Sequence, residues 1–485
     1  MTTQAPRPSV ADFKAWIKHK RVAVIGLGIS NRPLLRKLVE WGADVTAFDR
    51  LEPTSPDWHA IETELRDLNL RYSLGKDYLD DLHDFNVIFR TPVMRPDQPA
   101  FIEEIARGAI LTSEMEIFMT YCPARMIAVT GSDGKTTTTT LIAELLRRAG
   151  YTVHLGGNIG RPLLPEIETI AADDIAVLEL SSFQLSSMRV SPEVAVITNI
   201  SPNHLDVHKD FEEYYLCKRR LIENQKITDI AVLNGHDEIL RSFITETKGE
   251  VIWFNEKPAD HRELFAVTDE GIVREREGER DALILRDEAI AIPGRFNREN
   301  YAAAIAAVSR LIDLDNPVIG ELAETFGGVK HRLQRVGSLN GVDFYNSSID
   351  SSPQRSKASL SVFIEHKRPL ILITGGKDKN CDYSELGAAI LDATERIIFC
   401  GANQALIRNS LLAEASARGI DAADLTLIDA TDYADALAKA EPLMRAGDAV
   451  LLSPAGTSFD RYHNFEERGR DFETEVTAFI ERRSS

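Results

Sequence analysis

A glycine-rich loop contains the residue types that bind nucleotide phosphates. The apolar run 126–129 is followed at 130–137 by Thr-Gly-Ser-Asp-Gly-Lys-Thr-Thr, and then by a helical pattern. Glycine N–H groups can close around phosphate, Lys135 supplies a full positive charge, and the Thr136 hydroxyl suits Mg²⁺. An incidental glycine turn is the alternative. The order of strand, glycines, Lys-Thr and helix favours a phosphate loop, which alone fits kinases, GTPases and ligases equally well.

Two polar residues follow buried strands downstream of this loop. Glu179 ends the run 175–178, and His204 comes shortly after the run 194–200. Parallel α/β sheets place ligands at the carboxyl ends of their strands, so Glu179 is predicted to hold Mg²⁺ and His204 to lie near the ligand. A lone histidine is otherwise most often a surface or packing residue.

Lys218 lies in an apolar stripe of a predicted helix. Phe211, Tyr214, Leu221 and Ile222 share its face at helical spacing. The default interpretation is that its side chain extends to water. The alternative is a buried lysine with a lowered pKa, whose free amine takes up carbon dioxide and becomes a carbamate suited to a second Mg²⁺.

Two further patterns have simpler explanations. Asn297 stands where a helix is expected to begin, so capping accounts for Asn297 and its neighbour Asn300. The glycine-dense turn 156–162 is interpreted as a connector, although such turns also let backbone approach a ligand.

The chain before the loop predicts a β-α-β unit. Its first turn carries Gly26 and Gly28, and Asp49 ends the second strand, where ribose hydroxyls are usually held. Asn31-Arg-Pro replaces the third glycine of the dinucleotide fingerprint, so an NAD-dependent oxidoreductase is a remote alternative. A Rossmann-like domain for another nucleotide-containing molecule is favoured.

The whole chain is predicted to form three α/β domains. Residues 1–113 form the Rossmann-like domain, and 114–328 form a central parallel-sheet domain around the phosphate loop. Residues 329–485 alternate strand and helix again, with polar loops at 375–379 and 454–460 after two strands. A length of 485 residues allows two to four cores.

Composition narrows the partners and the compartment. A net charge of −19 argues against nucleic acid or an acidic membrane as the main partner, so small substrates are expected. The four cysteines have no Cys-x-x-Cys spacing, which argues against zinc and a disulfide framework. No apolar run is long enough to span a bilayer, and the N-terminus lacks a signal-peptide core. A cytoplasmic monomer is expected.

Taken together, these motifs make the chain resemble the Mur ligases, the ATP-dependent amide-forming enzymes of bacterial peptidoglycan synthesis. The resemblance covers nearly the whole chain. It rests on Gly-Leu-Gly, Thr-Gly-Ser-Asp-Gly-Lys-Thr, Gly-Gly-Asn-Ile-Gly, Glu-Leu-Ser-Ser-Phe-Gln-Leu, Thr-Asn-Ile, Asn-His-Leu-Asp, Lys218, His-Arg-Leu and Leu-Ser-Pro-Ala. The short family loop explains why Val129 replaces the first Walker glycine. Glu-Leu-Ser-Ser-Phe-Gln-Leu favours the member that adds D-glutamate to UDP-N-acetylmuramoyl-L-alanine through an acyl phosphate.

The resemblance also implies site residues. Thr136 and Glu179 would bind one Mg²⁺, and His204 with carbamylated Lys218 the second. Catalytic roles are implied for Lys135, His204, Lys218 and Lys379. ATP would contact Gly131, Ser132, Asp133, Gly134, Lys135, Thr136, Thr137, Asn297, Asn300 and Arg332. The UDP-substrate would contact Ile29, Ser30, Asp49, Arg50, Asn158 and Ser181. The amino acid would contact Ser351, Lys379, Ser458 and Phe465.

Two departures from the family pattern leave alternatives open. Residues 347–352 read Ser-Ser-Ile-Asp-Ser-Ser where many members have Asp-Ser-Lys-Ala-Thr-Asn, and Val93 replaces a common glycine on the uridine side. The first departure bears on the ATP side and the second on the fit of the uracil. Separately, the added amino acid could be L-glutamate or another acidic residue, because Lys379 and Ser458 recognise carboxylates without fixing handedness. A nucleotide-binding partner subunit with little ligase activity is the alternative from another class.

Overall fold

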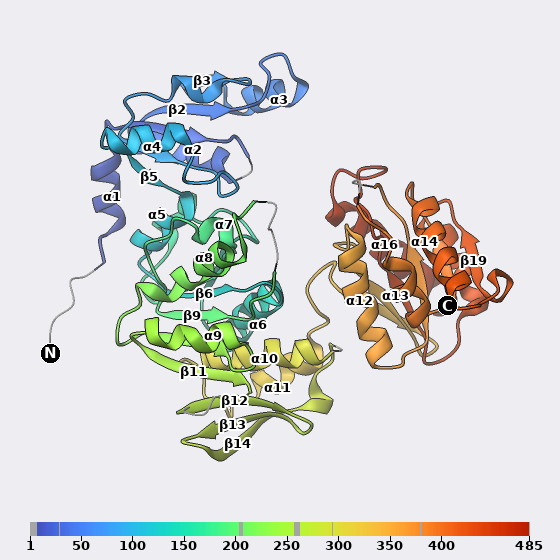
Figure 1. The fold of residues 1–485 in the computed structure, drawn as a ribbon. Helices are drawn as coiled ribbons and strands as arrows, with labels where there is room; N and C mark the ends of the chain where they lie inside the picture. The colour runs from blue at the N-terminus through green and yellow to red at the C-terminus, as the bar shows by residue number, and fades with distance from the viewer. Residues whose placement is uncertain are drawn as a thin grey trace. The chain divides into compact units, whose positions relative to one another are not determined.

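The computed structural model describes residues 7–28, 30–202, 207–256, 262–292, 294–378 and 381–484. It contains three sheets, one in each predicted domain, and the predicted α/β class is confirmed (Figure 1). The sheets belong to two compact units. The first unit comprises Met1–Glu288 and Arg298–Leu322, and the second Ala289–Asn297 and Ala323–Ser485. The exact domain boundaries stay predictions.

The first sheet is parallel throughout, with strand order β3-β2-β1-β4-β5. Alternate residues of β1 enter different cores: Val22 and Val24 pack toward α2, whereas Ala23 and Ile25 pack toward α4. Its strands are β1 (Arg21–Ile25), β2 (Asp44–Asp49), β3 (Arg71–Leu74), β4 (Val87–Phe89) and β5 (Ile110–Thr112). Its helices are α1 (Val10–Ile17), α2 (Asn31–Glu40), α3 (Pro56–Leu65), η1 (Tyr78–Asp81), α4 (Pro99–Ala106) and α5 (Glu114–Tyr121).

The second sheet has the order β14-β13-β12-β11-β10-β9-β6-β8-β7, parallel from β12 to β7. Its strands are β6 (Arg125–Thr130), β7 (Val153–Gly157), β8 (Ile175–Glu179), β9 (Val194–Ile197), β10 (Ile230–Asn234), β11 (Glu250–Asn255), β12 (Glu263–Thr268), β13 (Gly271–Arg276) and β14 (Glu279–Arg286). The connecting helices are α6 (Lys135–Arg148), η2 (Leu164–Thr169), α7 (Ser182–Leu185), α8 (Phe211–Glu223), α9 (Glu238–Ser242), η3 (Phe243–Glu246), η4 (Asp287–Ala289), α10 (Arg295–Val308) and α11 (Val318–Thr325). Strand β6, which leads into the phosphate loop, therefore lies between β8 and β9.

The third sheet, in the second unit, has the order β15-β16-β20-β17-β18-β19. Only β15 runs antiparallel to its neighbour. Its two faces form separate cores, one under α12 to α14 and the other under α15 and α16. Its strands are β15 (Gln334–Leu339), β16 (Val342–Asn346), β17 (Leu370–Thr374), β18 (Arg396–Phe399), β19 (Thr426–Asp429) and β20 (Ala449–Leu452). Its helices are α12 (Pro353–Glu365), α13 (Leu386–Ala393), α14 (Gln404–Ala417), η5 (Ala422–Asp424), α15 (Tyr433–Ala440), η6 (Glu441–Leu443) and α16 (Phe465–Ser484).

One predicted helix boundary is wrong. Helix α10 begins at Arg295, so Asn297 lies inside its first turn and does not cap it. Gly294 precedes the helix with φ +101°, a conformation that glycine adopts readily, and so lets the chain enter the helix at Arg295. Among the described residues, no helix is long and apolar enough to cross a membrane.

Candidate active site

The loop between β6 and α6 is shaped by two glycines. Gly131 has φ +148°, and a Cβ added there would lie 1.9 Å from Thr198 Oγ1. Gly134 has φ +77° and stands at the start of α6. Lys135 Nζ donates to the carbonyls of Gly131 and Ser132, both at 2.9 Å. The lysine thus bends back over the loop, the position from which it can reach phosphate oxygens.

The end of β9 fixes this loop. Asn199 accepts from the Ser132 N–H through its carbonyl and from the Asp133 N–H through its side chain, both at 2.9 Å. The Ser132 hydroxyl donates to Ser201 O at 2.9 Å. Tyr214 of α8 forms a further 2.9 Å hydroxyl–hydroxyl bond to Ser132. The loop is held from the neighbouring strand and from a helix, which leaves its glycine N–H groups in a fixed arrangement.

Glu179 ends β8 beside Val129 of β6 and Gly157 of β7. Its side chain is 1% exposed. Asn158 Nδ2 donates to Glu179 Oε1 at 2.7 Å, and the Asn158 N–H donates to Glu179 O at 2.7 Å. Glu179 Oε2 is buried without a hydrogen-bond partner among the described residues. A buried, unpartnered carboxylate oxygen next to a phosphate loop fits a cation ligand.

Lys218 is 1% exposed, which excludes the default prediction that its side chain reaches water. Its Nζ donates to Gly131 O at 2.6 Å and lies 4.6 Å from the centre of the Tyr214 ring. Burial lowers the pKa of Lys218 well below its ordinary value, and the charge of Lys135 lowers it further. Opposing contributions to that pKa come from Asp133 and Glu179. The structure thus brings both lysines and Glu179 into one electrostatic environment.

Other predicted nucleotide residues are divided between the units. Asn300 of α10 accepts from the Thr138 hydroxyl at 3.2 Å. Its Oδ1 lies 2.4 Å from the position of a Cβ added to Gly134, so Asn300 covers the loop. Thr136 is half-buried, whereas Thr137 is buried. Asn297 and Arg332 belong to the second unit.

The predicted UDP-binding turn of the first sheet is held by its own side chains. Asp49 accepts from the N–H groups of Leu27, at 2.6 Å, and Leu51, at 3.0 Å. Asn31 donates to the carbonyls of Ile25 and Gly26. Asp49 therefore shapes the turn with both carboxylate oxygens, while Ser30 and Arg50 are exposed beside it. In the central sheet, Ser181 caps α7 through a reciprocal pair with Gln184.

The second unit gathers three predicted amino-acid residues near strand ends. Ser458 is buried and follows β20, Ser351 follows β16, and Phe465 begins α16. Ser348 Oγ donates to Phe465 O at 2.8 Å. In the departing segment, Asp350 is buried, accepts from Ser453 Oγ at 2.8 Å and has its pKa raised to about 6 by burial.

Sequence reasoning missed several residues that hold these sites. Arg468, 1% exposed, donates to Ser348 Oγ, Ser348 O and Gly456 O, and so joins two loops of the second unit. The sequence feature that could have indicated this role is a charged residue three positions after Phe465, which places both on the same face of a helix. Tyr214 lies in the apolar stripe and Asn199 in the Thr-Asn-Ile motif, but neither pattern predicted a bond to Ser132 or Asp133.

Three predicted residues, Ile29, His204 and Lys379, lie outside the described residues. Among the residues that are described, no group of three or more His, Cys, Asp or Glu side chains is arranged to hold a metal ion.

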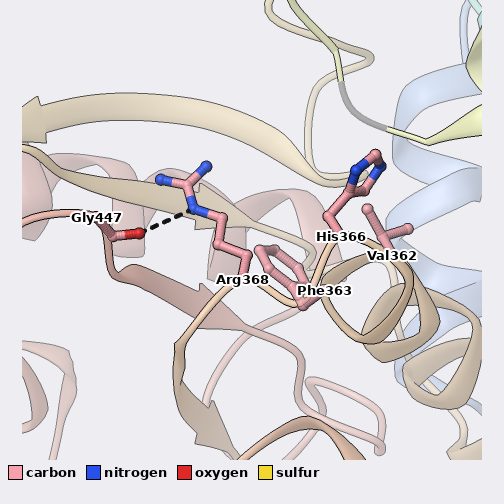
Figure 2. A pocket seen from close by; sticks show the side chains of 5 residues that line it. All are labelled: Val362, Phe363, His366, Arg368 and Gly447. Atoms are coloured by element: carbon pink, nitrogen blue, oxygen red, sulfur yellow. Dashed lines mark hydrogen bonds between the residues drawn. The ribbon is translucent and has the colours of Figure 1, made fainter.

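A hollow of about 400 Å³ in the second unit is a different feature (Figure 2). It is lined by Val362, Phe363, His366, Arg368 and Gly447. Arg368 and Gly447 precede β17 and β20, so the hollow is at the amino ends of these strands. Parallel sheets bind ligands at the opposite edge, which argues against this hollow as the amino-acid site.

Comparison with known proteins gives two family matches. The profile for the Mur ligase middle domain matches residues 129–308, and that for the Mur ligase, glutamate ligase domain matches residues 331–456. A UDP-N-acetylmuramoylalanine–D-glutamate ligase of Ruminiclostridium cellulolyticum is 46% identical over 95% of this chain and 97% of its own. The enzyme of the same name from Acetivibrio thermocellus is 45% identical over 96% of this chain and 98% of its own.

Solved structures resemble the fold at lower identity. UDP-N-acetylmuramate-alanine ligase from Thermotoga maritima has a TM-score of 0.55 and 18% identity, covering 95% of this chain and 100% of that one. MurF ligase from the same organism, solved in complex with ADP, has a TM-score of 0.53 and 18% identity, and the match covers 96% of this chain and 97% of that one.

Proposed function

The chain belongs to the Mur ligase family, and we propose that it joins D-glutamate to UDP-N-acetylmuramoyl-L-alanine with hydrolysis of ATP to ADP and phosphate, in peptidoglycan precursor synthesis. The single observation that carries this proposal is the 46% identity to a D-glutamate ligase over nearly the full length of both chains. The phosphate loop, Glu179 and Lys218 supply the matching chemistry.

The reaction needs activation because a carboxylate is a poor electrophile. The L-alanyl carboxylate attacks the γ-phosphorus of ATP, an acyl phosphate forms, and ADP leaves. The D-glutamate amine then attacks the acyl carbon, phosphate departs, and the amine loses a proton. Lys135 and the N–H groups of residues 131–136 would neutralise phosphate charge in the first step.

Mg²⁺, when bound, would offset the negative charge of the phosphate oxygens. The residues present fit it: Glu179 offers an unpartnered buried oxygen and Thr136 a hydroxyl at the start of α6. We propose two ions, the second held by His204 and carbamylated Lys218. In carbamylation the Lys218 amine forms an N–C bond to carbon dioxide and releases one proton, and burial favours this step because it lowers the pKa of the amine.

The remaining roles follow the family pattern. We assign UDP-substrate contacts to Ile29, Ser30, Asp49, Arg50, Asn158 and Ser181, nucleotide contacts to 131–137 with Asn297, Asn300 and Arg332, and amino-acid contacts to Ser351, Lys379, Ser458 and Phe465. Lys135, His204, Lys218 and Lys379 are the proposed catalytic residues. We further propose a cytoplasmic monomer acting on small molecules.

Coupled phosphate release tests the function. Release should require ATP, Mg²⁺, UDP-N-acetylmuramoyl-L-alanine and D-glutamate together, and mass spectrometry should show the glutamyl product. Turnover with L-glutamate in place of D-glutamate would overturn the assigned stereochemistry. No release with any acidic amino acid would favour the alternative of a nucleotide-binding partner subunit.

A further inference from the structure

The loop after β4 belongs to the first sheet, and its side chains contact elements of the central sheet within the first unit. It begins at Arg90, which is 1% exposed, and runs to Asp97. Thr91 lies against the glycine turn of β1: a Cβ added to Gly26 would be 3.3 Å from Thr91 Cβ. A ligand on the Gly26 turn would therefore border this loop, which we call the 91–97 loop.

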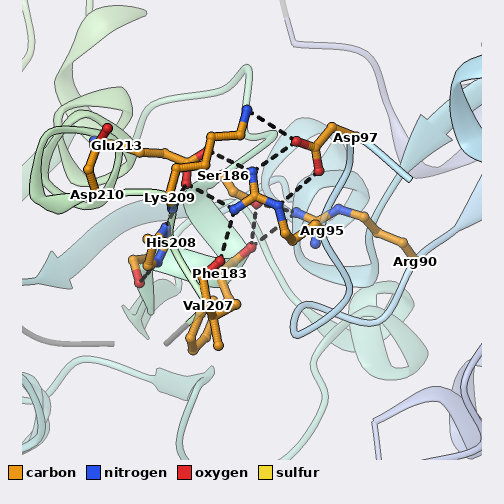
Figure 3. Close-up of polar contacts among 11 residues, drawn as sticks. Arg90, Arg95, Asp97, Phe183, Ser186, Val207, His208, Lys209, Asp210 and Glu213 are labelled. Atoms are coloured by element: carbon orange, nitrogen blue, oxygen red, sulfur yellow. Dashed lines mark hydrogen bonds and ion pairs between the residues drawn. The ribbon is translucent and has the colours of Figure 1, made fainter. Parts of the chain in front are cut away.

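Arg90 anchors the start of this loop. Its guanidinium donates to Pro92 O and Met94 O, both at 2.9 Å, so the loop folds around it. The same group donates to Phe183 O at 3.0 Å and Ser186 Oγ at 2.8 Å, at the helix that follows Glu179 (Figure 3). Burial lowers the pKa of Arg90 to about 10, so its charge is retained at neutral pH.

Arg95 anchors the end of the loop to α8. It makes two parallel bonds to Glu213, Nη1 to Oε2 at 2.9 Å and Nη2 to Oε1 at 2.8 Å (Figure 3). Nη1 also donates to Val207 O at 2.9 Å. On its other side Arg95 pairs with Asp97 of its own loop at 2.9 Å. A planar, doubly hydrogen-bonded arginine fixes its partner's orientation as well as its distance.

Glu213 is in the first turn of α8, next to Tyr214. Tyr214 bonds Ser132 of the phosphate loop, and Lys218, one turn further along the helix, bonds Gly131 O. Backbone hydrogen bonds fix the geometry of a helix over two turns. The position of Glu213 therefore helps to set where Tyr214 and Lys218 meet the phosphate loop. The chain of contacts is continuous from the 91–97 loop to the phosphate loop.

We propose that Arg95 is a positioning residue for the ATP site: through Glu213 it fixes α8, and with it Tyr214 and Lys218, against the phosphate loop. Arg95 itself lies in the 91–97 loop, which borders the predicted UDP-binding turn through Thr91. The inference rests on the proposed function for the identity of the two sites. It predicts that damage on the UDP-substrate side weakens binding of ATP, and that the two ligands favour one another's binding.

The test is a double-mutant cycle on the full chain, read by binding of a fluorescent, non-hydrolysable ATP analogue with Mg²⁺ and no UDP-substrate. Arg95→Ala and Glu213→Ala should each weaken binding about tenfold, a mid-range coupling between sites. The double variant should be no weaker than either single variant, because the two residues act as one unit. Arg95→Lys, which keeps the charge but loses the paired geometry, should fall between Arg95→Ala and the parent.

Two controls separate positioning from general damage. Asp97→Ala removes the other carboxylate partner of Arg95 but leaves the bond to α8, so analogue binding should change less than twofold, within the scatter of surface ion pairs. Arg71→Ala breaks an exposed ion pair with Asp44 in the same sheet and should have no effect. Thermal unfolding of each variant confirms that it is folded.

The outcomes are distinct. If the parent protein binds the analogue and Arg95→Ala binds equally well, the positioning role is overturned while the ligase function stands. Strictly additive losses from Arg95→Ala and Glu213→Ala would overturn the pairing. If the parent protein fails to bind the analogue, the proposed function falls and takes this inference with it.

Discussion

Replacing Asn158 with alanine should weaken Mg²⁺ binding without preventing folding. Among the described residues, Asn158 supplies the one side-chain hydrogen bond to the buried Glu179 carboxylate, at 2.7 Å. A hydrogen bond to a charged group contributes about 1.5–3 kcal/mol, which corresponds to roughly a 10- to 150-fold change in affinity. Loss of groups that orient a metal ligand typically costs about 10- to 100-fold in metal affinity. We therefore expect a loss of between one and two orders of magnitude.

The assay must distinguish this role from a contact between Asn158 and the muramoyl substrate. Mn²⁺ electron paramagnetic resonance, or Mg²⁺ titration of ATP-analogue fluorescence, measures metal binding with no UDP-substrate present. Only the metal-side role predicts a change under those conditions. A matched control is Asn86→Ala, which removes an exposed asparagine that accepts from the Arg21 N–H in the first sheet. An unchanged metal affinity in Asn158→Ala would refute the reasoning.

Three further changes test other parts of the structure. Lys218→Ala should abolish phosphate release, and millimolar formate or acetate should partly restore it by standing in for the proposed carbamate; undiminished turnover would remove Lys218 from the site. Burial raises the pKa of Glu114 to about 7 in the folded protein, compared with 4.5 when the chain is unfolded. The free energy of unfolding should therefore fall by about 3 kcal/mol as the pH rises from 4.5 to 7, because the folded state holds this proton more tightly. Glu114→Gln still accepts from the Leu164 N–H, and its urea-unfolding free energy relative to the parent should therefore rise between pH 4.5 and 8, whereas a constant difference would contradict this. Gly157→Ala would place a Cβ 2.2 Å from Glu179 O at φ +100°, so both melting temperature and Mg²⁺-dependent analogue binding should fall; normal binding would show that β7 can shift away.

The sequence was informative where chemistry depends on local order. Glu179 was predicted because a carboxylate ends an apolar strand near a phosphate loop, and that strand is β8. The buried position of Lys218 also follows from helical spacing, although spacing alone left exposure to water as the default. The three sheets followed from alternating apolar runs and helices.

Contacts set by strand register could not be predicted in this way. The Asn158–Glu179 bond exists because Gly157 of β7 pairs with Glu179 of β8, and a shift of one residue would turn the side chain to the other face. Arg95 and Glu213 are 118 residues apart in sequence, so no spacing rule connects them. The start of α10 was misplaced because Gly294, not a side-chain cap, sets the entry to the helix.

The second unit is assembled from two stretches of chain. Residues Ala289–Asn297 belong to it, the chain then returns to the first unit for Arg298–Leu322, and Ala323 begins the long remainder. The Ala291 N–H donates to Ala323 O at 3.0 Å, and this hydrogen bond joins the short stretch Ala289–Asn297 to the long one that begins at Ala323. A fragment cut at Ala323 would lack this stretch, and during synthesis on the ribosome neither half can complete its own packing before the other has begun. Because Ala289–Asn297 precedes Arg298–Leu322 in the chain, part of the second unit is synthesised before the first unit is complete.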